Sequence, residues 1–411
     1  MTTNHTRINQ SRLPGRHFLQ IPGPSPVPDR IVRAMAMPVL DHRGPEFQKL
    51  GHRVLEGIKT IFKTRGPVVI FPASGTGAWE AALVNVLAPG DHVLMYETGY
   101  FATMWKTMAL KLGLVPEFMG TDADADWRTG VDAARIEARL REDRGAVIKA
   151  VCVVHNATST GVTSRIDDIR RAIDAAGHPA LLMVDTISGL GSADYRHDEW
   201  GVDISISGSQ KGFMMPPGIS FNAVSDKALA VAKASKTAKA YWAWDEMIPA
   251  NKTGFFPTTP ATTLLYGLAE AIDMLHEEGL DHVFARHHRH AEATRRAVRG
   301  WGLEIFCRDP KFYSPVLTAV LMPEGHNADT LRKVALENFD ISLGSGLGRI
   351  AGKVFRIGHL GDINDLTLLG ALAGVEMSLA LAGVPHRKGG VTTAMDYLTD
   401  SRKSATPRPA A

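Results

Sequence analysis

The segment from Ala180 to Phe221 constrains this chain most strongly, because two apolar runs in it end on or beside a charged residue. The run 180–184 is short and ends on Asp185, as expected of a buried parallel strand that presents a carboxylate at its C-terminal edge. The run 202–207 ends in the small-residue sequence GSQKG, which contains Lys211. The sequence therefore predicts that Asp185 and Lys211 each follow a buried strand.

An acid and a lysine at such positions fit the chemistry of pyridoxal phosphate (PLP). The lysine amine makes a Schiff base with the cofactor aldehyde, and the carboxylate keeps the pyridine nitrogen protonated, so that the ring can absorb electrons from a carbanion. The alternative is a solvated lysine and an unrelated strand-end aspartate. A lysine between small residues, followed by the helix-breaking sequence PPG, is poorly placed for that role. We predict that Lys211 and Asp185 are catalytic and bind PLP.

The strings MVDTISGLG and SGSQKGFMMPPG resemble the fold-type I, class V aminotransferases, and within them the alanine-glyoxylate and serine-glyoxylate aminotransferase family. The resemblance extends from about Phe18 to Leu381. It implies an α/β fold with a mostly parallel sheet, helices on both faces, and a smaller α+β domain near the C-terminus. The alternation of strand-like and helix-like segments predicts the same parallel sheet, whose ligands gather at the carboxyl ends of the strands.

The chain has 411 residues, more than one hydrophobic core usually organises, so two domains are expected. We predict an N-terminal arm over 1–45, a large PLP-binding domain over 46–298, a small domain over 299–385 and a flexible tail over 386–411. The first 17 residues and the tail are polar and contain proline or glycine. The PGP sequence near the N-terminus also resembles the family, in which this arm approaches the active site.

Composition excludes several classes of partner. The formal net charge of +3 gives no support for a nucleic-acid partner. No apolar stretch is long enough for a membrane span, and the N-terminus lacks the apolar centre of a signal peptide. Two cysteines, Cys152 and Cys307, form neither a disulfide framework nor a zinc site. We expect a cytoplasmic enzyme, and the histidines between 282 and 290, which alternate with arginines, fit a solvated helix better than a metal site.

Small and hydroxyl-bearing residues at a predicted helix start form a candidate phosphate site. Ser74, Gly75 and Thr76 follow the apolar run 68–71 and open the helix that continues AWEAALVNVLA. Free backbone N–H groups and the positive end of the helix dipole favour an anion at such a place. The alternative is a helix cap without a ligand. Together with Lys211, the pattern favours the phosphate of PLP.

Further cofactor residues follow from the resemblance. Phe101 lies at a strand-to-helix turn, and the matching aromatic residue in the family stacks on the pyridine ring; a core phenylalanine is the alternative. Thr158, or Ser159 in its place, is predicted to donate a hydrogen bond to the phenolic oxygen of PLP. The family usually has glutamate where Ala157 stands, which leaves these hydroxyls untouched. Gln210, beside the lysine, is also assigned to the cofactor site.

Two residues outside the predicted large sheet complete the site. Arg356 lies in an apolar strand bounded by glycine and matches the family arginine that holds the substrate carboxylate; a structural salt bridge is the alternative. Thr258 or Thr259, in the segment FFPTTP, corresponds to a family segment that reaches the phosphate across a dimer interface. The resemblance implies a homodimer with shared active sites, with a tetramer also open.

The predicted activity is transfer of an amino group from a small amino acid to glyoxylate. The motifs PASGTGAWE and NATSTGV look more like serine-glyoxylate than alanine-glyoxylate members, so L-serine is the predicted donor and alanine the alternative. A cysteine desulfurase-like lyase would need a reactive cysteine on a mobile loop, and neither cysteine fits. A non-catalytic scaffold would have no reason to keep buried charges.

Overall fold

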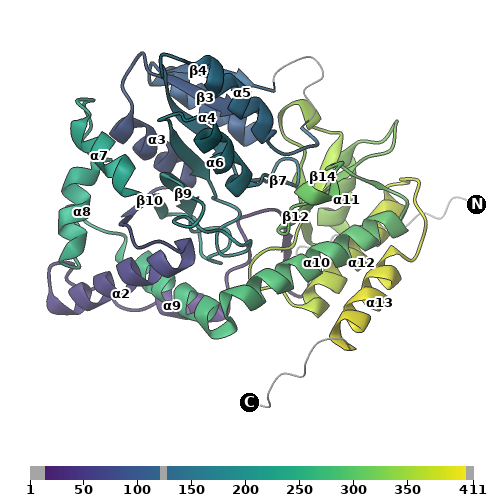
Figure 1. The fold of residues 1–411 in the computed structure, drawn as a ribbon. Coiled ribbons are helices and arrows are strands. Elements are labelled where there is room, and N and C mark those ends of the chain that lie inside the picture. The colour runs from purple at the N-terminus through teal and green to yellow at the C-terminus, as the bar shows by residue number, and fades with distance from the viewer. Residues whose placement is uncertain (1–13, 121–126, 404–411) are drawn as a thin grey trace, which may run out of the picture.

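A seven-stranded sheet forms the centre of the molecule in the computed structural model, which describes residues 14–120 and 127–403 (Figure 1). Its strands, in spatial order, are β2 (Val68–Phe71), β10 (Ser220–Val224), β9 (Ile204–Gly208), β8 (Leu181–Asp185), β5 (Ile148–Val154), β3 (His92–Tyr96) and β4 (Val115–Met119). Strand β10 is antiparallel to both neighbours, and every other pair is parallel. The predicted mostly parallel sheet is confirmed.

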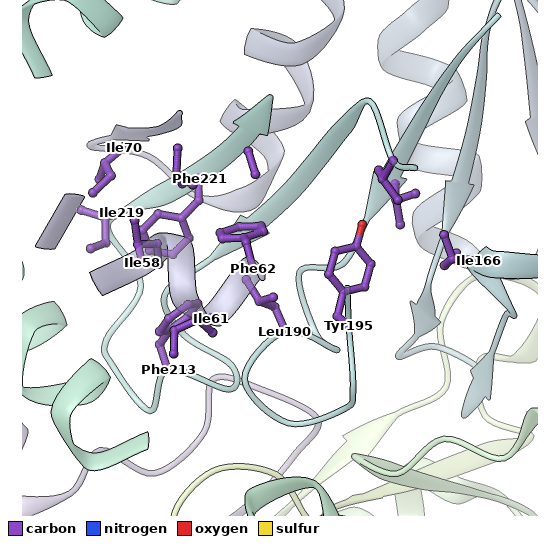
Figure 2. Packing of buried hydrophobic residues seen from close by; sticks show 14 of the residues in the cluster. Ile58, Ile61, Phe62, Ile70, Ile166, Leu190, Tyr195, Phe213, Ile219 and Phe221 are labelled. Carbon is purple, nitrogen blue, oxygen red and sulfur yellow. The ribbon is translucent and has the colours of Figure 1, made fainter. Parts of the chain in front are cut away.

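The central strands of this sheet are buried on both faces, which explains why β8 and most of β5 read as apolar runs. Successive residues of a strand point to opposite faces, so Leu182 and Val184 join one core cluster and Leu181 and Met183 join another. The first cluster includes residues of α2 (Pro45–Phe62), α5 (Ala133–Glu142), α6 (Ile166–Ala175) and α9 (Thr262–Glu278). The second includes residues of α3 (Gly75–Val86), α4 (Tyr100–Lys111), α7 (Asp226–Ala234) and α8 (Trp244–Lys252). Figure 2 shows part of the first cluster, where Phe62 and Phe221 pack edge to face.

A second, five-stranded sheet lies beside the first. Its order is β1 (Phe18–Gln20), β13 (Ile341–Ser345), β14 (Val354–Gly358), β12 (Leu317–Leu321) and β11 (Glu304–Ile305). The helices with it are α10 (Leu280–Gly300), α11 (Ala328–Phe339), α12 (Asp365–Leu381) and α13 (Gly390–Lys403) (Figure 1). Strand β1, from the predicted arm, pairs in parallel with β13, so the start of the described chain is built into the small sheet.

The remaining elements are short or lie near the N-terminus. Helix α1 (Asp29–Met35) packs on α9, and β6 (Asn156–Ala157) pairs with β7 (Val162–Thr163) in a two-stranded ribbon after β5. Within residues 14–120 and 127–403, no helix is long and apolar enough to cross a membrane.

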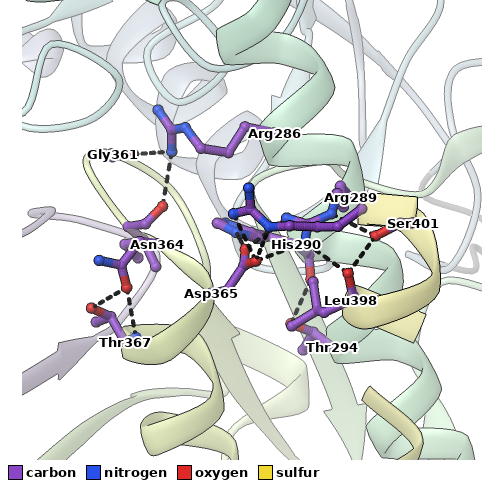
Figure 3. Close-up of polar contacts among 12 residues, drawn as sticks. Arg286, Arg289, His290, Thr294, Gly361, Asn364, Asp365, Thr367, Leu398 and Ser401 are labelled. Atoms are coloured by element: carbon purple, nitrogen blue, oxygen red, sulfur yellow. Dashed lines mark hydrogen bonds and ion pairs between the residues drawn. The ribbon is translucent and has the colours of Figure 1, made fainter. Parts of the chain in front are cut away.

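Helix α13 lies within the segment 386–411 that the sequence predicts to be flexible. Arg289 on α10 donates from Nη1 to Asp365 at 2.6 Å and from Nε to the Ser401 hydroxyl at 2.7 Å (Figure 3). Gly300 and Gly390 allow a close approach of α10 and α13, since a Cβ on Gly300 would lie 2.8 Å from the Cα of Gly390. The tail up to residue 403 is therefore a packed helix, and residues 404–411 lie outside the described residues.

The histidines of α10 differ from the prediction of a solvated helix. His287 and His290 are buried, because α10 packs against α12 and α13 as well as the small sheet. His287 Nδ1 lies 2.7 Å from the carbonyl oxygen of Val283, and His290 Nε2 lies 3.0 Å from Asp365. His287 is hydrogen-bonded at both ring nitrogens, whereas the buried Nδ1 of His290 has no hydrogen-bond partner among the described residues.

Candidate active site

One cavity at the carboxyl ends of the large-sheet strands brings together the predicted site residues except Arg356 and Thr258. Those lining it are Ser74, Gly75, Thr76, Phe101, Thr158, Asp185, Gln210 and Lys211. They come from the ends of β2, β3, β8 and β9 and from the β6–β7 ribbon. The edge of the sheet where ligands gather in such folds is therefore the edge that carries the candidate residues.

Asp185 is the last residue of β8 and is buried. Its Oδ2 accepts a hydrogen bond from Trp79 Nε1 at 3.1 Å, and its Oδ1 accepts one from the backbone N–H of Ile187 at 2.8 Å. Burial raises the pKa of Asp185 to about 7, against the lowering effects of these two donors and of Lys211. A carboxylate held in this way gains from a cationic group placed beside it in the cavity.

Lys211 follows β9 and reaches back toward the N-terminal residues. Its Nζ donates a hydrogen bond to the carbonyl oxygen of Pro22 at 2.6 Å. Burial lowers the pKa of Lys211 to about 8, and Arg356 lowers it further while Asp185 opposes the shift. A substantial share of this amine is therefore neutral near pH 8, which is the form that attacks a carbonyl.

The first turn of α3 presents backbone N–H groups to the cavity. Ser74 is the N-cap residue and its side chain makes no capping hydrogen bond. A Cβ on Gly75 would lie 2.3 Å from Ile187 Cδ1, so a larger residue there would have to displace the Ile187 side chain. Within the part of the chain that the structure describes, the buried Gln210 Oε1 has no hydrogen-bond partner. A helix start favours an anionic group, and the unpaired acceptor oxygen of Gln210 fits a ligand that also carries a hydrogen-bond donor.

The structure distinguishes between the alternatives that the sequence left open for Phe101 and for the pair Thr158 and Ser159. Phe101 is half-buried, lines the cavity and packs edge to face with Tyr100. Thr158 lines the cavity, whereas the Ser159 hydroxyl accepts a hydrogen bond from the Tyr100 backbone N–H at 3.1 Å. The geometry therefore favours Thr158 over Ser159. Thr258 is exposed and does not line this cavity.

Arg356 lies on β14 and is buried beside the cavity. Its Nη1 donates to the carbonyl oxygen of Thr158 at 2.6 Å and its Nε to that of Ser345 at 2.7 Å. Burial lowers its pKa to about 10. In residues 14–120 and 127–403, no carboxylate lies within ion-pair distance of Arg356, which argues against the structural salt bridge. A guanidinium that is buried without a counter-ion favours an anionic ligand.

Sequence reasoning missed several residues of the cavity. Trp79 lies one turn into α3, and helical spacing from Gly75 and Thr76 would have placed it on the same face. Asn156 precedes Thr158 in the motif NATSTG, and its Nδ2 donates to the Ser188 hydroxyl at 2.7 Å. The contact between Asn156 and Ser188 joins segments that are distant in the sequence, so local patterns carry no signal for it.

The chain matches the class-V aminotransferase family over residues 18–360. It is 48% identical over 398 residues to a serine-glyoxylate aminotransferase of Methylorubrum extorquens, covering 95% of this chain and 98% of the relative. An L-aspartate-glyoxylate aminotransferase of Paracoccus denitrificans is 43% identical over 387 residues, covering 94% and 97%. The crystal structure of ureidoglycine-glyoxylate aminotransferase from Bacillus subtilis matches with a TM-score of 0.86 and 27% identity, covering 95% of this chain and all of that one. This chain belongs to the class-V aminotransferase family.

Proposed function

We propose that this enzyme uses PLP to transfer the amino group of L-serine to glyoxylate, giving hydroxypyruvate and glycine. The observation that carries the proposal is the burial of Lys211 and Asp185 in one cavity with the N-terminus of α3. The likeness to serine-glyoxylate aminotransferases at 48% and 47% identity supports this substrate pair.

The cavity residues fit PLP in charge and in hydrogen-bonding character. Ser74, Gly75 and Thr76 supply the helix start for the phosphate, Asp185 the anion for the pyridine nitrogen, and Thr158 a hydroxyl for the phenolic oxygen. When bound, PLP supplies an aldehyde that takes up an amino group and a ring that withdraws electrons from the substrate Cα. Phe101 would cover a face of that ring and exclude water from it.

Side chains of the protein would carry out proton transfer, binding of the substrate carboxylate and pairing with the cofactor ring nitrogen. Lys211 would hold the cofactor through its amine, and the free amine would move the proton of the substrate Cα. Arg356 binds the substrate carboxylate and so orients the Cα toward Lys211. Asp185 would pair as a carboxylate with the cofactor's ring nitrogen, and a cationic partner there would stabilise its anionic form.

Small, uncharged donors fit this site better than dicarboxylates. Arg349, in the turn between β13 and β14, is bound to Glu97 at 3.0 Å and lies over the ring of Trp127, so its charge is already compensated. A serine hydroxyl gains about 1 kcal/mol from a hydrogen bond that alanine cannot make. L-Serine is therefore the preferred donor, and alanine the slower one.

The decisive experiment is a donor comparison at fixed glyoxylate. Serine should give a higher kcat/KM than alanine or aspartate; an alanine value above that of serine would reject serine as the donor and leave the aminotransferase reaction intact. Lys211→Ala should abolish both turnover and the visible absorption of the bound cofactor. Lys252→Ala, at an exposed lysine outside the cavity, is the matched control and should retain both.

We also propose a twofold dimer with shared active sites. Thr258 and Thr259 are exposed in the single chain and lie outside its own cavity lining. Delivery of one of these threonines to the phosphate site of a second copy would explain their position.

A further inference from the structure

Residues 20–25, here called the N-terminal strap, run from the small sheet to the lysine of the large sheet. Gln20 Nε2 donates to the carbonyl oxygen of Gly358 at 2.7 Å, at the end of β14. A Cβ on Gly358 would lie 2.2 Å from the carbonyl oxygen of Ile21. The strap therefore packs so closely on β14 that a side chain at Gly358 would displace it.

The other side of the strap contacts the lysine loop at three points. Lys211 Nζ donates to the carbonyl oxygen of Pro22 at 2.6 Å. The Ser25 hydroxyl donates to the carbonyl oxygen of Lys211 at 2.8 Å, and the Ser25 N–H donates to that of Gln210 at 3.1 Å. Both the main chain and the amine of Lys211 are thus bonded to the strap.

Gly23 makes this approach possible. Its φ of +99° lies in the region that favours glycine. A Cβ at this residue would lie 2.3 Å from Lys211 Cδ and 2.4 Å from Lys211 Nζ. The lysine side chain occupies the space that any other residue at position 23 would need.

The loop that contains Gly361 packs against Ser25. A Cβ on Gly361 would lie 3.1 Å from the Cβ of Ser25, and Ser25 itself is buried. The Gly361 N–H donates to His287 Nε2 at 3.1 Å. The Gly361 carbonyl oxygen accepts from Arg286 Nη1 at 2.8 Å (Figure 3). The N–H and the carbonyl oxygen of Gly361 both bond to side chains of α10, so the loop that contacts Ser25 is anchored to that helix.

We propose that the N-terminal strap positions the catalytic lysine. The Pro22 carbonyl oxygen holds the Lys211 amine whenever that amine is not bonded to the cofactor, and Ser25 is the positioning residue that fixes the Lys211 main chain for this contact. The inference rests on the proposed role of Lys211 as the PLP-binding lysine.

The contact suits an amine that must be released and recaptured in every cycle. A lysine side chain has many rotamers, and a single acceptor in a buried place selects one of them. A neutral amine that donates one N–H to Pro22 keeps its lone pair free for the substrate proton or for the cofactor aldehyde. The strap thereby keeps the Lys211 amine within the cavity and leaves its lone pair free to accept a proton.

The test compares Ser25→Ala with Ser378→Ala. Ser378 is a buried serine of α12 whose hydroxyl donates to the Gly374 carbonyl oxygen at 2.7 Å, so the control removes the same kind of bond far from the lysine. Cofactor-free full-length protein is mixed with PLP, and the rate of cofactor loading is followed by visible absorbance from pH 6 to pH 9. The steady-state kcat and KM for serine are measured on the loaded enzymes.

We expect Ser25→Ala to lower both the loading rate and kcat about fivefold, the effect of one lost hydrogen bond, with the KM for serine unchanged. Ser378→Ala should match the wild type in all three. Gly23→Ala, which removes no hydrogen-bonding group, should slow loading at least as much, because its Cβ displaces the Lys211 side chain.

Wild-type loading and kcat in Ser25→Ala and Gly23→Ala would overturn the inference and leave the proposed function standing. Equal losses in Ser378→Ala, or a KM that rises in step with the fall in kcat, would also overturn it, because they indicate general loosening. If Ser25→Ala fails to fold, Gly23→Ala decides by the same measurements. Failure of the wild-type protein to load PLP would instead reject the proposed function.

Discussion

Arg356 on β14 and Thr158 after β5 are joined by a hydrogen bond of 2.6 Å from Nη1 to the main-chain oxygen. This bond ties the small sheet to the residue whose side chain lines the cofactor cavity. The guanidinium of Arg356 is also the proposed binding group for the substrate carboxylate. The residue that would bind the substrate is therefore one that already links the two sheets.

Arg356→Lys should therefore weaken substrate binding more than it slows chemistry. A lysine keeps the charge and loses the planar fork, so the KM for serine should rise about 10-fold or more while kcat changes less. Steady-state kinetics at saturating glyoxylate measure both. Arg387→Lys is the control, because Arg387 is exposed and its side chain donates to the carbonyl oxygen of Arg299, away from the cavity. A KM unchanged from wild type would exclude Arg356 from substrate binding.

Asp185→Asn should make the cofactor-free protein more stable at high pH and the enzyme inactive. Burial raises the folded-state pKa of Asp185 to about 7, above the usual value near 4, so the wild type loses stability as the pH rises from 4 through 7. The asparagine carries no charge and should escape this loss, gaining about 4 kcal/mol at pH 8 and little at pH 4. Thermal unfolding of both cofactor-free proteins across this pH range checks the sign, and equal pH profiles would contradict it.

Mixed dimers should reveal whether Thr258 acts across the interface. Thr258→Asp places a negative charge where the partner's phosphate is expected, and Lys211→Ala removes the lysine, so each variant alone should be inactive. A dimer with one chain of each kind contains one site with both native residues, so an equimolar mixture should recover about a quarter of wild-type activity. Thr259→Asp in the same assay identifies the threonine concerned. No recovery after subunit exchange would rule out the shared site.

Arg289→Ala should lower the thermal midpoint by loosening α13. Burial raises the pKa of Asp365, but Arg289, His290 and Arg402 outweigh it and hold that pKa below the usual range. The stabilisation is therefore present at neutral pH and is lost as the pH falls below about 4. Lys403→Ala, which removes the exposed pair with Asp400 on the same helix, should have little effect. Differential scanning calorimetry at pH 7 compares them; equal midpoints would show that Arg289 does not anchor α13.

The sequence predicted the parts of this protein that local patterns encode. The run that became β8 is short, apolar and ends on Asp185, and the run that became β9 alternates and leads into the GSQKG sequence, so strand ends and site residues could be placed together. Gly75 at the start of α3 was recognisable for the same reason. In each case a polar or small residue lies within a few positions of the end of a hydrophobic or alternating run.

Other features depend on partners far away along the chain. The tail sequence from Pro385 contains glycine and serine, which favour a loop, yet α13 is stabilised by Arg289 and by the close approach at Gly300. Likewise, nothing near Pro22 indicates that its carbonyl oxygen meets Lys211. His287 and His290 looked solvated because the helices that cover them lie later in the sequence. Tertiary contacts override local composition at these places.

The pairing of β1 with β13 sets an order in which the protein can be completed during its synthesis. Phe18 pairs with Ile341, so the first described strand has no partner until nearly the whole chain has left the ribosome. Domains that are synthesised first generally fold first, and the strands of the large sheet all precede residue 225. All strands of the sheet that carries Lys211 are therefore synthesised before β13, the strand that pairs with β1. A chain interrupted before β13 would have every strand of the large sheet and no partner for β1.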